Sequence, residues 1–179
     1  VEALDVLERN FGVDYTMETN LKESWRYPLH VTYNNGRYPD FGDVSPSYGL
    51  SGLSFMYFTW KLKNPFTYDF VRKAFEAGRG GFPAWQWYVS GITPKSREEL
   101  IPSHYFPVKG HLVMRSGWSD DCVINIFKCG PNSNHYHYDQ GTFYLMANGE
   151  ELLSDAGHGS SYYANLYYPC YYTQAIGHN

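Results

Sequence analysis

The sequence has little cysteine, no excess of basic residues and no long hydrophobic run. Its three cysteines, Cys122, Cys129 and Cys170, match no metal-binding spacing, and any disulfide scheme leaves one thiol over. Cys122 and Cys129 lie seven residues apart on one expected strand, so they should point to opposite faces, which argues against a bond between them. Cysteine usage therefore does not decide the redox compartment.

The balance of charge and hydropathy argues against two kinds of partner. Fourteen Lys and Arg against 18 Asp and Glu give a net charge of −4 and a pI near 5.9, whereas a nucleic-acid surface needs concentrated positive charge. No segment approaches the ~20 apolar residues of a membrane span, and no signal peptide opens the chain. We expect no nucleic-acid or membrane partner, and nothing indicates an oligomeric state.

Aromatic residues, in contrast, are abundant. They make up 19% of the chain, with 18 Tyr and 5 Trp, and 43% of all residues are hydrophobic, which is enough for a packed core. Aromatic side chains combine a flat apolar face with a polar edge, so they suit sugar rings as well as protein interiors. Carbohydrate is therefore the first ligand class to consider, with a tyrosine-rich core as the alternative.

The first half of the chain predicts helices joined by loops. Apolar residues three or four apart predict a helix that ends at Gly12, a second helix is expected over 17–32, and another over about 68–77. Asn, Gly and Pro crowd residues 34–49, which predicts a long loop. The chain begins inside an expected helix and ends just after a histidine, as expected for part of a longer protein.

The pattern changes near residue 101 to short β-rich runs bounded by Gly, Asn and Asp. The sequence "MANGEELL" places Asn148-Gly149 where a two-residue hairpin turn is expected. Helices followed by antiparallel strands, without βαβ alternation, predict an α+β fold. We assign 1–100 to a helical part and 101–179 to a β-sheet part.

The segment "NSNHYHYDQG" concentrates the candidate chemistry. His135, His137 and Asp139 alternate, so in extended backbone they share one face, and Asp155 and His178 follow later. Burying two imidazoles is costly unless a metal, a carboxylate or a ligand satisfies them, although a solvated loop tip is the alternative. His137, Asp155 and His178 would suit a tetrahedral zinc ion, with Asp139 orienting an imidazole and His135 facing a cleft.

A competing motif shares this pattern. "HYHYDQ" is similar to the H-x-H-x-D-H signature of metallo-β-lactamases, in which two zinc ions activate a water molecule. Here Gln140 replaces the last histidine, and the αββα context is missing. A metal-dependent hydrolase is therefore retained as the lesser alternative.

Several features in order resemble the heparinase II/III-like polysaccharide lyases, including the related alginate lyases. Within 110–179 these features are an Arg before Gly-Trp, a Gly-Pro, the H-x-H-x-D-x-G-x-F core, a D-x-G after the hairpin, a Tyr-rich loop and a closing His-Asn. The earlier "NNGRYPDFGD" is similar to a loop of the same family. The resemblance implies the last helices of an (α/α) toroid followed by the first strands of an antiparallel β-sandwich.

The resemblance also implies an activity, which is β-elimination on an acidic, uronic-acid-containing polysaccharide such as a glycosaminoglycan or alginate. By similarity His135 would be the catalytic residue in the cleft, and His137, Asp155 and His178 would hold a structural zinc. Export to the bacterial periplasm or secretion is implied by the resemblance alone. A non-catalytic carbohydrate-binding or structural module is the alternative from another class.

Other residues receive roles of lesser weight. Arg37 and Asp43 are candidates for substrate binding or for ion pairs that brace their loop, and Tyr162 and Tyr163 for sugar stacking, proton relay or packing. The principal tyrosine acid/base and the carboxylate neutraliser are expected upstream of Val1. We assign helix packing to Tyr15, Tyr27 and Tyr33, domain contacts to Arg115 and Trp118, and ordinary surface or interface positions to His30, His104, His111 and His158.

Overall fold

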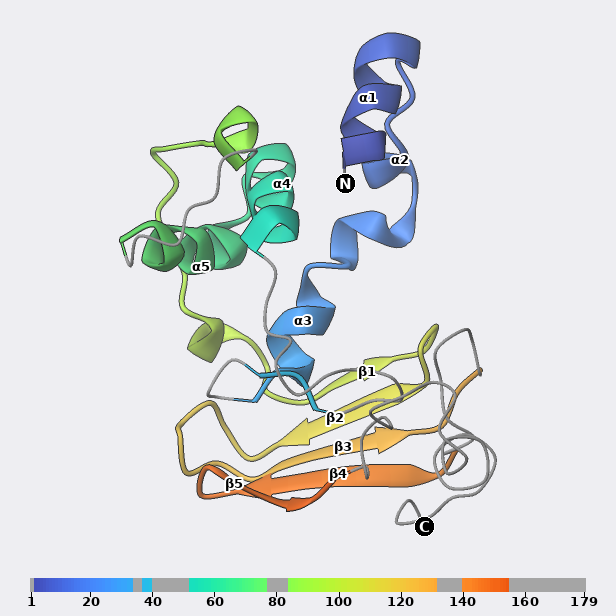
Figure 1. Cartoon of the computed structure of the whole chain (residues 1–179), viewed down its shortest axis with the longest axis vertical. Coiled ribbons are helices and arrows are strands. Elements are labelled where there is room, and N and C mark those ends of the chain that lie inside the picture. The colour runs from blue at the N-terminus through green and yellow to red at the C-terminus, as the bar shows by residue number, and fades with distance from the viewer. Residues whose placement is uncertain (1, 34–36, 40–51, 77–83, 132–139, 155–179) are drawn as a thin grey trace, which may run out of the picture. The chain divides into compact units, whose positions relative to one another are not determined.

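The computed structural model describes residues 2–33, 37–39, 52–76, 84–131 and 140–154 (Figure 1). The chain divides into a helical unit, Val1–Leu29 with Ser51–Leu100, and a sheet unit, His30–Leu50 with Ile101–Asn179. Residues 30–50 thus group with the sheet, although they precede it by many residues. The predicted division into a helical part, 1–100, and a β-sheet part, 101–179, stays a prediction.

The first helices follow the chain's capping residues. Helix α1 covers Glu2–Phe11 and ends where predicted, because Gly12 has φ +69 and its N–H bonds the carbonyl of Glu8 at 2.9 Å. The continuous helix expected over 17–32 was wrong. Thr19 adopts extended backbone, so the chain forms α2 (Tyr15–Glu18), the 3-10 helix η1 (Asn20–Glu23) and α3 (Arg26–Val31).

The helical unit is completed by α4 (Gly52–Leu62), α5 (Pro65–Glu76) and the 3-10 helices η2 (Ala84–Trp87) and η3 (Arg97–Glu99). Helix α5 begins three residues earlier than predicted, because Pro65 fits the first helical position. The Asn64 side chain accepts the N–H groups of Phe66 and Thr67 at 2.9 and 3.2 Å.

Helix α4 forms the core of the helical unit. It buries Phe55, Met56, Tyr57 and Phe58, which explains why this helix is apolar on most sides. The Phe55 ring lies 4.7 Å from that of Phe70 on α5, and Trp87 of η2 meets the Tyr57 ring edge-on at 5.4 Å. These contacts join α4, α5 and η2 into one packed group.

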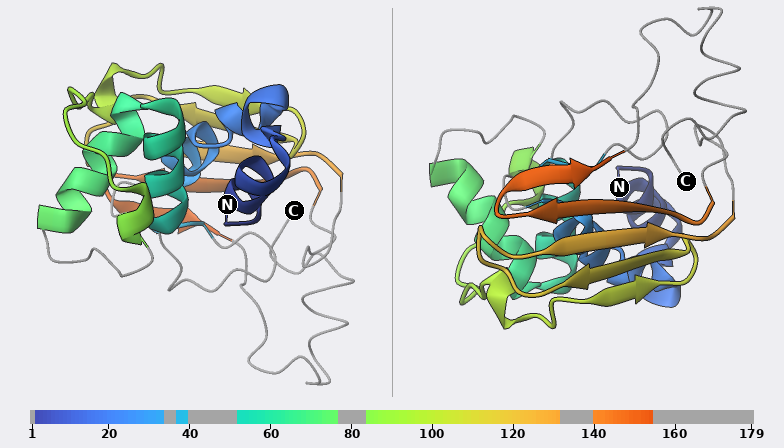
Figure 2. Two further views of the ribbon diagram at one scale, coloured as in Figure 1. Left: turned by 90° about the horizontal axis from the view of Figure 1, so that it is seen from above. Right: turned by 90° about the horizontal axis from the view of Figure 1, so that it is seen from below.

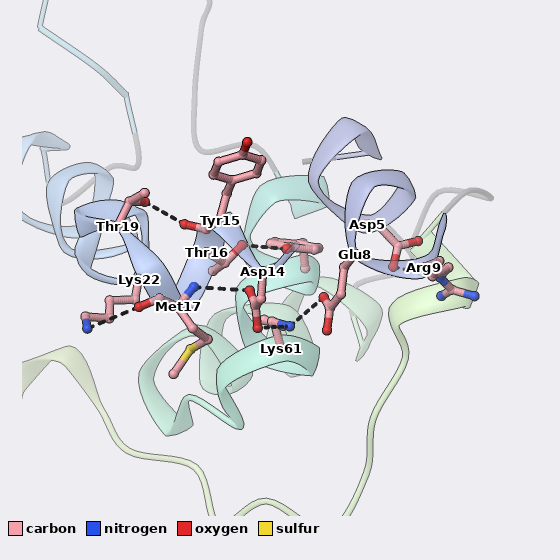
Figure 3. A network of polar contacts seen from close by, with 11 residues as sticks. Asp5, Glu8, Arg9, Asp14, Tyr15, Thr16, Met17, Thr19, Lys22 and Lys61 are labelled. Atoms are coloured by element: carbon pink, nitrogen blue, oxygen red, sulfur yellow. Dashed lines mark hydrogen bonds and ion pairs between the residues drawn. The ribbon is translucent and has the colours of Figure 1, made fainter. Parts of the chain in front are cut away.

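A buried lysine links α4 to the start of the chain (Figure 3). The Lys61 ammonium lies 2.5 Å from Glu8 Oε2 and 2.6 Å from Asp14 Oδ2, with only 9% of its side chain exposed. Close by, the Thr16 hydroxyl and the Tyr57 hydroxyl share a buried hydrogen bond of 2.6 Å. Polar contacts therefore fix α1 and α2 on α4.

The sheet unit is a five-stranded antiparallel sheet in the order β1-β2-β3-β4-β5 (Figure 2). Its strands are β1 (His104–Phe106), β2 (His111–Arg115), β3 (Ile124–Lys128), β4 (Thr142–Ala147) and β5 (Glu150–Leu153). The predicted hairpin turn is confirmed, because Asn148 and Gly149 both have positive φ, at 51 and 77. The predicted α+β class is likewise confirmed.

The two faces of the sheet differ in burial. Val113, Ile126 and Tyr144 form one row across β2, β3 and β4, and each is completely buried. Met114 and Phe143, which point to the other face, are 40% and 48% exposed. Alternation along β2, β3 and β4 thus sets one core face, whereas β5 is exposed along its length. Among the helices that the structure describes, none is both long and apolar enough to cross a membrane.

Candidate functional site

Most of the predicted site lies outside the described residues. Among the predicted site residues, the structure describes Arg37. The residues outside the described ranges are His135, Asp43, Tyr162, Tyr163, His137, Asp155 and His178, together with Asp139. The structure does describe the strand ends between which the H-x-H-x-D segment runs. The site is therefore built from the sheet that carries this segment.

The chain leaves β3 and enters β4 at one end of the sheet, and hydrogen bonds hold both points. The Gly130 N–H donates to Gln140 Oε1 at 2.7 Å, and the Gly141 N–H donates to the Lys128 carbonyl at 2.8 Å. Sequence reasoning noted Gln140 only as a departure from the metallo-β-lactamase signature. Its side chain instead joins the residue that follows the H-x-H-x-D segment to Gly130, which precedes the segment.

Two glycines allow a close backbone crossing at this end of the sheet. A Cβ on Gly110 would lie 2.2 Å from the Cys129 carbonyl oxygen, and one on Gly130 would lie 2.5 Å from the Lys109 carbonyl oxygen. The Cys129 N–H bonds the Gly110 carbonyl at 2.7 Å, and Gly110 has φ +63. Because only glycine fits both positions, the backbone itself fixes where the segment starts.

A polar row ends the buried face of the sheet at the same place. His111, Lys128 and Thr142 are register partners on β2, β3 and β4, with exposures of 0%, 1% and 2%. A buried ammonium is costly unless other groups compensate its charge, so this row is a specialised feature of the sheet. His111 is therefore not a surface histidine, and the interface alternative stays a prediction. The signal was its place two residues before Val113 on one face of "HLVMR".

Arg115 connects the sheet to the end of α3. Its Nη1 donates to the carbonyls of His30 and Thr32 at 3.1 and 3.0 Å, and its guanidinium lies 4.5 Å from the Trp118 ring centroid. Residues 30–32 belong to the same unit as Arg115, so these contacts lie within the sheet unit and the predicted domain contact stays a prediction. His30 is 1% exposed and its Nε2 donates to the Ile101 carbonyl at 3.1 Å, so it is not at the surface, and the interface alternative stays a prediction.

Arg37 follows this segment and is exposed. Its carbonyl accepts the Tyr33 N–H at 2.9 Å, and the buried Tyr33 hydroxyl donates to Glu151 Oε1 on β5 at 3.1 Å. Tyr33 therefore contacts the sheet through its hydroxyl, a role that was not predicted for it. Burial raises the pKa of the neighbouring Tyr38 to about 12, so Tyr38 keeps its proton at neutral pH.

Metal binding rests on donor chemistry. In the described ranges, no three His, Cys, Asp or Glu side chains gather closely enough to hold an ion. The predicted ligands His137, Asp155 and His178 lie outside those ranges. Two imidazoles and a carboxylate are donors that zinc prefers, so the residue set fits the ion. The zinc site stays a prediction.

The chain is similar in sequence and in fold to known heparin-sulfate lyases and heparinases. A heparin-sulfate lyase from Bacteroides stercoris is 31% identical over 80 residues, which cover 42% of this chain and 12% of the relative. A crystal structure of heparinase III matches with a TM-score of 0.59 and 19% identity, over 87% of this chain and 25% of that one. The resemblance to heparinase-type lyases is confirmed. No family model matches the chain.

The heparinase-like fold accounts for both halves of the chain. A second heparinase III structure, solved with methylated lysines, matches with a TM-score of 0.54 and 21% identity, over 81% of this chain and 20% of that one. The helical unit thus corresponds to helices of a toroid, and the five strands to part of a sandwich. The chain spans between 12% and 25% of the length of these relatives.

Proposed function

We propose that this chain is part of a polysaccharide lyase that cleaves an acidic glycosaminoglycan by β-elimination. The carrying observation is the heparinase III match, which extends over 87% of the chain and so includes both units. The sequence identity to a heparin-sulfate lyase supports the same assignment. The names of these relatives favour a glycosaminoglycan over alginate.

The reaction sets clear demands on the protein. A base removes the proton at C5 of the uronate, the electron pair forms the C4=C5 double bond, and the C4–O bond breaks as the leaving oxygen is protonated. Negative charge builds on the sugar carboxylate, so hydrogen-bond donors or cations must stabilise it. We assign His135 to this task, as neutraliser or as a proton-transfer residue.

The sheet supports this assignment through the residues that flank the segment. Gln140 bonds Gly130 at 2.7 Å, and Gly110 allows the close crossing beside them, so the backbone on both sides of the segment is fixed. Catalytic groups work best when their supporting backbone does not move during the reaction. A rigid base of this kind suits a segment that presents His135.

The other predicted site residues have supporting roles in this proposal. His137, Asp155 and His178 would hold a zinc ion, which braces the backbone near His135. Arg37 is exposed and would bind a carboxylate or sulfate of the substrate, with Asp43, Tyr162 and Tyr163 as further contacts. We place the protein in the bacterial periplasm or outside the cell, because its polymeric substrate is extracellular.

The decisive experiment measures the product. The full-length protein, incubated with heparan sulfate, should release an unsaturated uronate that absorbs in the near ultraviolet, and His135→Ala should abolish this signal. The matched control His104→Gln should retain it, since His104 has no assigned role in the reaction. A saturated product that disappears with chelator would show a metal-dependent hydrolase instead. Binding without any product would show a carbohydrate-binding module.

Metal analysis tests the zinc assignment separately. About one zinc per chain is expected in the purified protein, because one tetrahedral site is proposed. His137→Ala and Asp155→Ala should each lose it, and His104→Gln should keep it. A folded protein without metal would refute the zinc site and leave the elimination chemistry to be judged by its product.

A further inference from the structure

The last residues of α3 and the two residues that follow it are buried. His30, Val31, Thr32 and Tyr33 are each at most 2% exposed. Arg37, four positions after Tyr33, is exposed. We call residues 30–33 the strap, and the contacts of this strap with the sheet fix its path.

Arg115 fixes the first part of the strap. The last carbonyls of a helix have no partner within the helix, and the Arg115 guanidinium donates to two carbonyls at this helix end, those of His30 and Thr32. The Arg115 N–H is itself bonded to Ser103 Oγ at 3.0 Å, which anchors the arginine on the sheet. The end of α3 is thereby attached to β2.

Tyr33 fixes the second part. Its hydroxyl donates to Glu151 Oε1 on β5 at 3.1 Å, and its N–H bonds the Arg37 carbonyl at 2.9 Å. One residue therefore joins the far edge of the sheet to the backbone of Arg37. Arg37 is thereby tied through Tyr33 to the edge strand of the sheet.

We propose that Arg115 and Tyr33 are positioning residues that hold the backbone of Arg37 in place, so that the Arg37 guanidinium meets an oxyanion of the polysaccharide. This inference rests on the proposed function and extends it to the binding of substrate. An arginine on an unanchored turn must be ordered when the substrate binds, and that ordering weakens binding. Anchoring removes this cost before the encounter, so its loss should raise KM and leave kcat almost unchanged.

Kinetics of the full-length protein on heparan sulfate test the proposal. Tyr33→Phe deletes the hydroxyl alone and should raise KM by about 5-fold, because one buried hydrogen bond is lost. Glu151→Ala should have the same effect, whereas Glu151→Gln keeps an acceptor oxygen and should stay close to wild type. Arg37→Ala should raise KM at least as much, and adding Tyr33→Phe to it should change little, since the two act through one contact.

Limited trypsin digestion gives a readout that does not depend on activity. Trypsin must take the Arg37 carbonyl into its active site, and this carbonyl accepts the Tyr33 N–H. Cleavage after Arg37 should therefore be faster in Tyr33→Phe, Glu151→Ala and Arg115→Lys, while cleavage after the exposed Lys95 should keep its rate. Far-ultraviolet circular dichroism confirms that each variant is folded.

The outcomes separate this inference from the function on which it rests. No unsaturated product from the wild type refutes the lyase. A wild type that is active, with KM unchanged in Tyr33→Phe and Glu151→Ala, overturns the positioning role even if cleavage after Arg37 is faster. A rise in KM without faster cleavage also overturns it, because substrate binding would then have been weakened by another route.

Discussion

Lys61 should be the most sensitive polar residue of the helical unit. Its ammonium contacts Glu8 and Asp14 at 2.5 and 2.6 Å, and 9% of the side chain is exposed (Figure 3). Lys61→Met keeps most of the apolar stem and removes the charge, so both carboxylates lose their partner. The two carboxylates are 33% and 28% exposed, which allows water to compensate part of this loss.

The magnitude follows from these exposures. Breaking a fully buried pair costs about 3–5 kcal/mol, whereas a fully solvated pair contributes ~0–1 kcal/mol. A buried cation with two partly hydrated partners falls between these limits, so we expect a loss of about 2 kcal/mol in the free energy of unfolding. In urea denaturation at pH 7 this corresponds to a midpoint lower by about 1 M.

A double-mutant cycle isolates the charge interaction. Asp14 also caps α2 through the Met17 N–H at 3.1 Å, and Asp14→Asn preserves that cap while it removes the charge. The matched control is Lys73→Met, because Lys73 pairs with Asp69 at 2.7 Å but is 62% exposed. A Lys61→Met loss no larger than that of the control, or a coupling energy of zero with Asp14→Asn, would refute the reasoning.

Three further predictions concern pH and backbone geometry. Burial, the largest single effect, would raise the pKa of Asp14, but the hydrogen bond from Lys61, the backbone N–H groups of Met17 and Thr16 and the Lys61 charge together outweigh it, so the pKa is lowered. The Asp14 contribution to stability should therefore be present at neutral pH and be lost as pH falls below the ordinary aspartate range; acid titrations of stability should show this loss in wild type and not in Asp14→Asn. Burial raises the pKa of Tyr38 to about 12, so the unfolded chain should ionise this tyrosine at a lower pH than the folded chain. Between pH 10 and 12 the free energy of unfolding of wild type should therefore fall by up to about 3 kcal/mol relative to that of Tyr38→Phe. Equal stability of the two proteins over this alkaline range would contradict the prediction. Gly110→Ala should lower the free energy of unfolding by more than ~2 kcal/mol, because the added Cβ would lie 2.2 Å from backbone atoms and the residue has a positive φ. Thermal or urea unfolding measures this loss, and an unchanged stability would show that the backbone crossing can relax.

Local signals predicted the elements that depend on local physics. The hairpin at Asn148-Gly149 and the end of α1 at Gly12 were correct, because a positive φ strongly favours such residues whatever surrounds them. The helix expected over 17–32 failed for a related reason. The Thr19 hydroxyl accepts the Leu21 N–H at 3.2 Å, and this local cap competes with helical hydrogen bonding.

The site could be predicted only in part. Motif order indicated the heparinase-like family, and the comparisons confirmed that resemblance. Gln140 and Tyr33 were missed, because each makes its decisive contact with a residue at a distance that no spacing rule describes. Tyr33 and Glu151 are separated by 118 positions in the chain.

The sequence by itself determined the α+β class, a helical part followed by antiparallel strands, and the concentration of histidine and aspartate in one segment among those strands. Alternation and turn residues act over a few positions, so they can be read directly from the chain. Only the tertiary structure decided that Lys128 and His111 share a buried row and that Arg115 holds the end of α3 on the sheet. Those arrangements depend on register and on contacts between distant segments, which form when the core excludes water and each buried polar group must find a partner.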